Sequence, residues 1–172
     1  LDIDAIETAI TPKTAAIIIN TPNNPVGSVY SDENLTQLAD LLRAKSAEYG
    51  HTIYLISDEP YREITYGIEV PWVPSIYART IVCYSYSKAL SLPGERIGWV
   101  YVSDAADDGD AVAVAVAGAG RALGYVCAPV LLQRVAARCV GEPSDVAAYA
   151  ENRRLLTEGL SALGYEYVEP DG

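Results

Sequence analysis

Three short apolar runs in the first half of the chain are each followed at once by a polar, turn-forming motif. These runs are rich in β-branched residues and predict strands over 15–20, 53–57 and 80–85, with a further strand over 97–102. A helical pattern separates the first run from the second. Strands that alternate with helical segments are typical of βαβ units, so we predict an α/β fold with a largely parallel sheet.

The helix predicted between the first two strands covers residues 31–49. Ser31 can cap its N-terminus, two acidic residues follow in the first turn, and Gly50 can end it. We expect 59–66 to be irregular or partly helical and 86–95 to be a loop. One face of the helix carries its apolar residues, namely Leu35, Leu38, Ala39, Leu42 and Tyr49.

From residue 103 onward the pattern indicates helices alone. Helices are predicted over 111–122 and 129–140, and a third is predicted to begin at a Ser144 cap and to end at Leu163. A Gly-Glu-Pro-Ser break precedes this third helix. Residues 165–168 are predicted to begin a strand.

The composition argues against several classes of partner. The 172 residues contain 12 Lys and Arg against 23 Asp and Glu, a net charge of −11, which disfavours binding to nucleic acid or to an anionic membrane. The longest apolar stretch, 111–119, is too short to cross a bilayer. Cys83, Cys127 and Cys139 are odd in number and widely spaced, and no metal-binding spacing is present. These features predict reduced thiols and a cytoplasmic protein.

A lysine, Lys88, lies just past the third strand and has hydroxyls and a guanidinium close to it in sequence. Ser85 and Ser87 precede it and Arg96 follows eight residues later. A lysine amine can form a Schiff base with an aldehyde, and hydroxyls with an arginine can bind a phosphate. Because ligands of open α/β sheets bind beyond the carboxyl ends of the strands, this grouping predicts a site for a phosphorylated aldehyde cofactor.

The three motifs together resemble the large-domain signatures of pyridoxal 5'-phosphate (PLP) enzymes of the aspartate aminotransferase type, the class I/II aminotransferases of fold type I. The motifs are 20–27 (NTPNNPVG), 57–62 (SDEPYR) and 85–88 (SYSK), in the family's order and spacing. The resemblance implies a three-layer fold with a mostly parallel sheet and flanking helices. It also implies that 1–142 form the C-terminal part of the PLP-binding large domain. Residues 143–172 would be the linker helix and the start of a truncated small domain.

The resemblance also implies the roles of single residues in catalysis and ring binding. Lys88 would form the Schiff base and then move a proton between the substrate and the cofactor. Asp58 would pair with the protonated ring nitrogen and keep the ring an electron acceptor. Tyr61 and Asn24 would hydrogen-bond the phenolate oxygen. We further expect the Asn24–Pro25 peptide bond to be cis.

The cofactor phosphate would be bound by Ser85, Ser87 and Arg96, whose neutral and charged donors suit an anion. Arg62 and Glu95 are weaker candidates for the cofactor site, and we expect them to be solvated or to form local ion pairs.

The leading functional prediction is transfer of an amino group between an amino acid and a 2-oxo acid, with PLP as cofactor. Two alternatives stay open: another fold type I PLP enzyme, such as a C–S β-lyase, decarboxylase or synthase, and a non-catalytic PLP-binding domain. The resemblance implies a homodimer for the intact protein. It also implies that the groups which stack on the ring and grip the substrate carboxylate lie outside 1–172. We therefore expect this chain alone to be poorly active.

Overall fold

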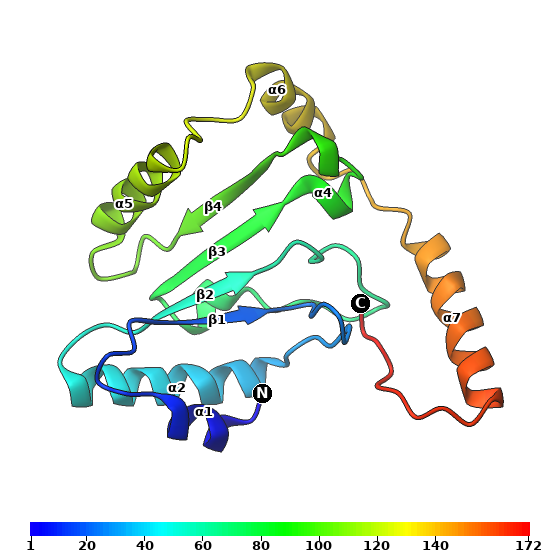
Figure 1. The fold of residues 1–172 in the computed structure, drawn as a ribbon, viewed down its shortest axis with the longest axis horizontal. Coiled ribbons are helices and arrows are strands. Elements are labelled where there is room, and N and C mark those ends of the chain that lie inside the picture. Colours follow the sequence, from blue (N-terminus) through cyan, green and yellow to red (C-terminus); the bar gives the residue numbers. More distant parts are fainter.

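The computed structural model describes residues 1–172, and its centre is a four-stranded sheet with strand order β1-β2-β3-β4 (Figure 1). β1, β2 and β3 are parallel, and β4 is antiparallel to β3. The predicted α/β class with a largely parallel sheet is thus confirmed. The strands are β1 (Ala16–Asn20), β2 (Tyr54–Asp58), β3 (Thr80–Ser85) and β4 (Gly98–Val102).

The helices connect the strands and then continue alone to the end of the chain (Figure 1). None of them has both the length and the apolar character that a membrane span requires. They are α1 (Ile3–Ala9), α2 (Asp32–Tyr49), α3 (Val73–Ile76), α4 (Tyr86–Ala89), the 3₁₀ turn η1 (Pro93–Glu95), α5 (Gly109–Ala122), α6 (Val130–Cys139) and α7 (Val146–Ala162).

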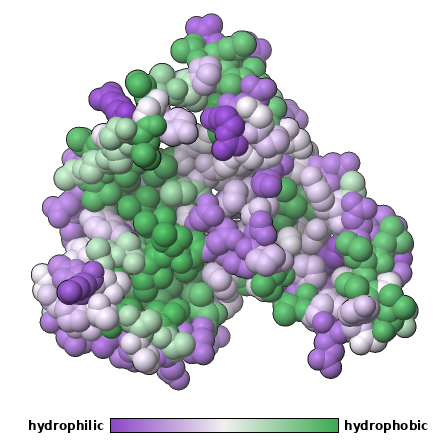
Figure 2. Space-filling view, in the orientation of Figure 1, coloured by the Kyte–Doolittle hydropathy of each residue, from purple (hydrophilic) through white to green (hydrophobic).

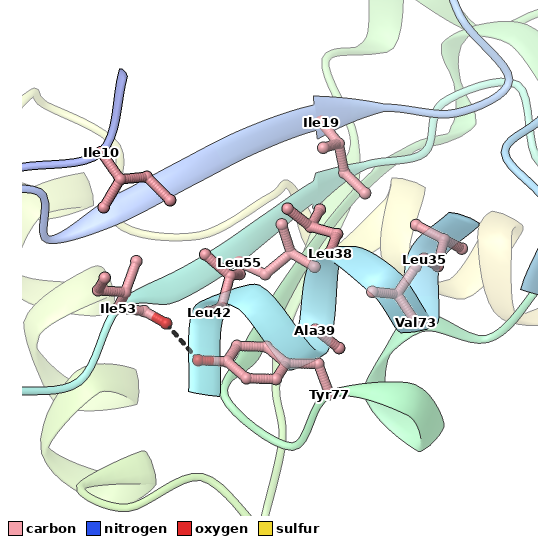
Figure 3. Close-up of a cluster of buried hydrophobic side chains, with 10 residues drawn as sticks. All are labelled: Ile10, Ile19, Leu35, Leu38, Ala39, Leu42, Ile53, Leu55, Val73 and Tyr77. Carbon is pink, nitrogen blue, oxygen red and sulfur yellow. Dashed lines mark hydrogen bonds between the residues drawn. The ribbon is translucent and has the colours of Figure 1, made fainter. Parts of the chain in front are cut away.

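The hydrophobic core lies between one face of the sheet and α2, with α1 and α3 beside it. The predicted apolar face of α2 supplies four fully buried residues, which pack against Ile19 and Leu55 of the sheet (Figure 3). Ser31 caps α2 by accepting a hydrogen bond from the Asn34 amide, and Gly50 ends it in the left-handed conformation, as predicted. Inside the core the hydroxyl of Tyr77 donates to the Ile53 carbonyl at 2.6 Å (Figure 3).

The opposite face of the sheet is covered by a helix only near β4. Ala117 and Gly120 of α5 line a cavity together with Cys83 and Val100 of the sheet. Towards β1 this face is open, and Ile18 is 70% exposed. Figure 2 shows hydrophobic residues gathered over the strands in this view. Within this chain the expected second helical layer therefore covers one end of the sheet.

The prediction of a loop over 86–95 is wrong, because this segment contains α4 and the 3₁₀ turn η1. Ser85 caps α4 by accepting from the Ser87 amide, and a proline opens η1. The predicted Ser144 cap of the last helix is also wrong. Asp145 accepts from the Ala148 amide at 3.1 Å, while the Ser144 hydroxyl donates to the Ala89 carbonyl at 2.9 Å. The domain boundary at residue 142 stays a prediction.

The strand predicted to begin at 165–168 does not form, because no other strand lies beside this segment to pair with it. The chain instead returns to the loop that follows β1. The Asp171 amide donates to the Gly27 carbonyl at 2.7 Å, and the Asp171 carboxylate accepts from the Val29 amide at 3.0 Å. The last residues of the chain thus pack against the motif of residues 20–27.

Candidate active site

The polar motifs converge at the carboxyl edge of the parallel strands. Asn20 at the end of β1 pairs in register with Asp58 at the end of β2, and Asp58 pairs with Cys83 in β3. Residues in register on neighbouring strands point to the same face, and Ser85, two residues past Cys83, lies on that face too. The predicted convergence of the strand ends is confirmed.

The side chain of Asn20 connects the first motif to the second. Its Nδ2 donates to the carboxylate Oδ2 of Asp58 at 3.2 Å and to the Asp58 carbonyl at 2.9 Å. Its Oδ1 accepts from the main-chain amide of Asn24 at 2.7 Å. The position of Asp58 relative to the loop around Asn24 is therefore set by one amide side chain.

Tyr61 connects the first motif to the third. Asn24 Nδ2 donates to the Tyr61 hydroxyl at 2.9 Å. The Lys88 ammonium lies 5.4 Å from the centre of the Tyr61 ring, within the range of a cation–π contact. Four of the predicted site residues, carried by three separate strand ends, thus form one connected group with Asn20.

The loop of the first motif is closely held and borders a small cavity. Its Asn24–Pro25 bond is cis, as predicted, and the Thr21–Pro22 bond is cis as well. The cavity has a volume of about 210 Å³. Its lining is mostly polar or proline, with Pro22, Asn23, Asn24, Pro25, Gly27, Tyr61 and Gly172.

The Asp58 carboxylate lies in a partly desolvated position without a cation beside it. Burial raises its pKa above the ordinary value for an aspartate. Asn20 is the only side chain that hydrogen-bonds it, and its second oxygen, Oδ1, has no hydrogen-bond partner within the chain. This oxygen is therefore free to accept a hydrogen bond from a ligand.

A buried ion pair anchors the turn that carries Asp58 and Tyr61. The Glu59 side chain is 0% exposed, accepts from Ser57 Oγ at 2.7 Å and pairs with Arg62 Nη1 at 2.5 Å. Burial raises the pKa of Glu59 even so. The predicted local ion pair of Arg62 is confirmed, and it joins two residues of the turn that are three apart in the sequence.

Of the three residues predicted to bind a phosphate, the structure brings two together. Ser85 Oγ donates to Ser87 Oγ at 2.7 Å and accepts from the Ser87 amide at 3.1 Å. Arg96 makes no hydrogen bond with either serine. It has a positive φ of 53° at the end of η1, and its guanidinium donates to the Pro93 carbonyl at 2.8 Å. The phosphate role of Arg96 stays a prediction.

The site residue that the sequence analysis missed is Asn20. It was visible as the first residue of its motif, directly after the apolar run. Recognising it required the register that pairs it with Asp58, which the sequence pattern leaves open.

Comparisons with known proteins agree with this arrangement. The family model described as "Aminotransferase class I and II" matches residues 1–172. The chain belongs to the class I and II aminotransferase family. Enzymes of this family depend on PLP. The suspected family of the sequence analysis is thus confirmed.

Relatives within the class I and II aminotransferases match nearly all of this chain. It is 33% identical to the aspartate/prephenate aminotransferase of Thermus thermophilus over 185 residues, 99% of this chain and 43% of that protein. A crystal structure of an aminotransferase from Eubacterium rectale is 56% identical, with a TM-score of 0.97, over 100% of this chain and 44% of that one. The aspartate aminotransferase structure from Thermotoga maritima is 28% identical, with a TM-score of 0.82, over 98% and 43%. The chain therefore spans less than half the length of these relatives.

Proposed function

We propose that the protein transfers an amino group between an amino acid and a 2-oxo acid, with PLP bound at Lys88. The observation that carries this proposal is the connected group of Asp58, Asn24, Tyr61 and Lys88 at one edge of the sheet. Family membership supports the reaction class.

The residues of the site fit PLP in their chemistry. Asp58 has a free carboxylate oxygen for a protonated ring nitrogen, and the Tyr61 and Asn24 side chains offer donors for a ring oxygen. Lys88 is exposed and forms no ion pair with a carboxylate, so its amine is available for reaction. Ser85 and Ser87 add hydroxyls that can donate to a phosphate.

PLP supplies, when bound, an aldehyde that condenses with amino groups and a ring that accepts electrons. The residues of the chain do the rest. The Asp58 carboxylate would hold a proton on the ring nitrogen, since a carboxylate beside that nitrogen favours its charged form. The Nζ of Lys88 would hold the cofactor and, as a free amine, would move a proton as a general base and acid.

The Tyr61 side chain would contribute in two ways, through its hydroxyl and through its ring. Its hydroxyl, which accepts a hydrogen bond from Asn24, would stabilise negative charge on a ring oxygen. Its ring lies beside the Lys88 ammonium, and this contact holds the lysine side chain close to the tyrosine.

The wider setting forms part of the same proposal. The small-molecule substrates are an amino acid and a 2-oxo acid, and the intact protein is a cytoplasmic homodimer. The resemblance described above supports the substrates and the homodimer, and the cysteine pattern supports the cytoplasm. The acidic net charge disfavours nucleic acid and anionic membranes as partners.

Isotope transfer tests the reaction class. The longest expressed form of the protein that contains residues 1–172 is supplied with PLP, an amino acid labelled in its amino nitrogen, and an unlabelled 2-oxo acid. We expect the label in the amino acid formed from the 2-oxo acid, and no transfer in Lys88→Ala. Release of the label as ammonia would replace the proposal with a lyase. Release of carbon dioxide without transfer of the label would replace it with a decarboxylase.

A further inference from the structure

Asn20 uses both polar atoms of its side chain within the candidate site. Its Nδ2 bonds the carbonyl and the carboxylate of Asp58, and its Oδ1 bonds the main-chain amide of Asn24. The Asn20 side chain thus links two motifs at strand ends that are more than thirty residues apart in the sequence. No other side chain in the chain hydrogen-bonds the Asp58 carboxylate.

We infer that Asn20 is a positioning residue which aims the Asp58 carboxylate at the cofactor ring nitrogen and keeps it ionised, an inference that rests on the proposed function. A half-buried carboxylate without a neighbouring cation depends on hydrogen-bond donors to stay charged. Asn20 provides the one side-chain donor, and it engages only Oδ2. The other oxygen is thereby left free for the ring.

The hydrogen bond from the Asn24 amide fixes the orientation of the Asn20 side-chain amide. Because Oδ1 accepts from the Asn24 amide, the side chain is fixed with its nitrogen towards Asp58. An amide rotated the other way would turn an oxygen towards the carboxylate and would lose all three hydrogen bonds. The loop that presents Asn24 to Tyr61 thus also determines which atom faces Asp58.

The substitution Asn20→Asp isolates the donor to Asp58. It keeps the shape of the side chain and keeps one oxygen that can accept from the Asn24 amide. The atom facing Asp58 becomes a second oxygen, and two adjacent carboxylates cannot both stay ionised. Asn23→Asp is the matched control. It makes the same change three residues along, where Oδ1 accepts from the Val26 amide and Nδ2 donates to the main-chain carbonyl of Asn20 at 3.4 Å. The Asn23 side chain forms no hydrogen bond with Asp58.

The readout is binding of two compounds, PLP and a carbocyclic analogue in which a C–H group replaces the ring nitrogen. Dissociation constants are measured by fluorescence titration with the longest expressed form of the protein. Hydrogen bonds to charged groups are worth enough that we expect Asn20→Asp to weaken PLP binding about tenfold or more. The affinity for the analogue should change less than about twofold, because it has no ring nitrogen to pair.

Asn23→Asp should leave the ratio of the two affinities at its wild-type value. Asn20→Ser, which shortens the donor without adding charge, should shift the ratio in the same direction by about threefold, and it serves as the test if Asn20→Asp does not fold. Equal weakening of both compounds in the Asn20 variants, or unchanged PLP binding, overturns the positioning role alone. A wild-type protein that binds neither compound overturns the proposed function together with it.

Discussion

Removing the positive partner of the buried Glu59 carboxylate should strongly destabilise the turn that carries Asp58 and Tyr61. We consider Arg62→Met, which keeps the aliphatic part of the side chain and removes the guanidinium. Glu59 is 0% exposed, so the substitution leaves an unpaired charge in the interior, with the Ser57 hydroxyl as its remaining partner. Breaking a buried ion pair in this way costs about 3–5 kcal/mol.

Smaller losses accompany this one. Arg62 also donates to the carbonyls of Val70 and Pro71, at 2.8 and 3.1 Å, and a lost hydrogen bond costs about 1 kcal/mol. Its guanidinium lies 5.3 Å from the centre of the Trp72 ring. Since such contributions do not add when they share a side chain, we expect a total of about 3–5 kcal/mol, with the unpaired carboxylate as the dominant cause.

Equilibrium unfolding in urea at neutral pH measures the effect. Arg154→Met is the matched control, because Arg154 pairs only with exposed glutamates on α7, and it should unfold close to the wild type. Adding Glu59→Gln to Arg62→Met should recover most of the lost stability, since the unpaired charge is then gone. An Arg62→Met protein as stable as Arg154→Met would refute the reasoning.

Two further predictions concern the loop and the site carboxylate. Gly27→Ala should lower the melting temperature more than Gly124→Ala: both glycines have positive φ, but only at Gly27 would a Cβ meet Pro170, at 2.6 Å. Equal effects would contradict this packing. Asp58→Asn should be more stable than the wild type at neutral pH, by a margin that shrinks as the pH is lowered. Burial raises the folded pKa of Asp58, so wild-type stability falls as pH rises from about 4 through that pKa. A stability difference between Asp58→Asn and the wild type that did not change with pH in urea unfolding would contradict this prediction.

The elements that sequence reasoning predicted well are those whose signals are local and redundant. α2 has a serine cap, an apolar face with four buried residues, and a glycine stop, and these three signals agree. The β-branched runs likewise marked three strands, and the rule that ligands bind at the carboxyl edge of a parallel sheet placed Asp58 and Lys88 at one site.

The missed features depend on contacts between distant residues. α4 has four residues, too few for a helical period, and it was interpreted as a loop. Ser144 and Asp145 can both cap a helix, and only the packing of Ser144 against Ala89 decides between them. The role of Asn20 required the register of β1 on β2. The segment at 165–168 has strand propensity, but no strand lies beside it.

Chemical trapping of the cofactor tests the central claim most directly. The longest expressed form of the protein is incubated with PLP, reduced with borohydride, digested and mapped by mass spectrometry. We expect the label on the peptide that carries Lys88, and little on the peptides of Lys13 and Lys45. Asp58→Asn should reduce this labelling. Labelling spread evenly over the three lysines, or absent from Lys88, would contradict the account.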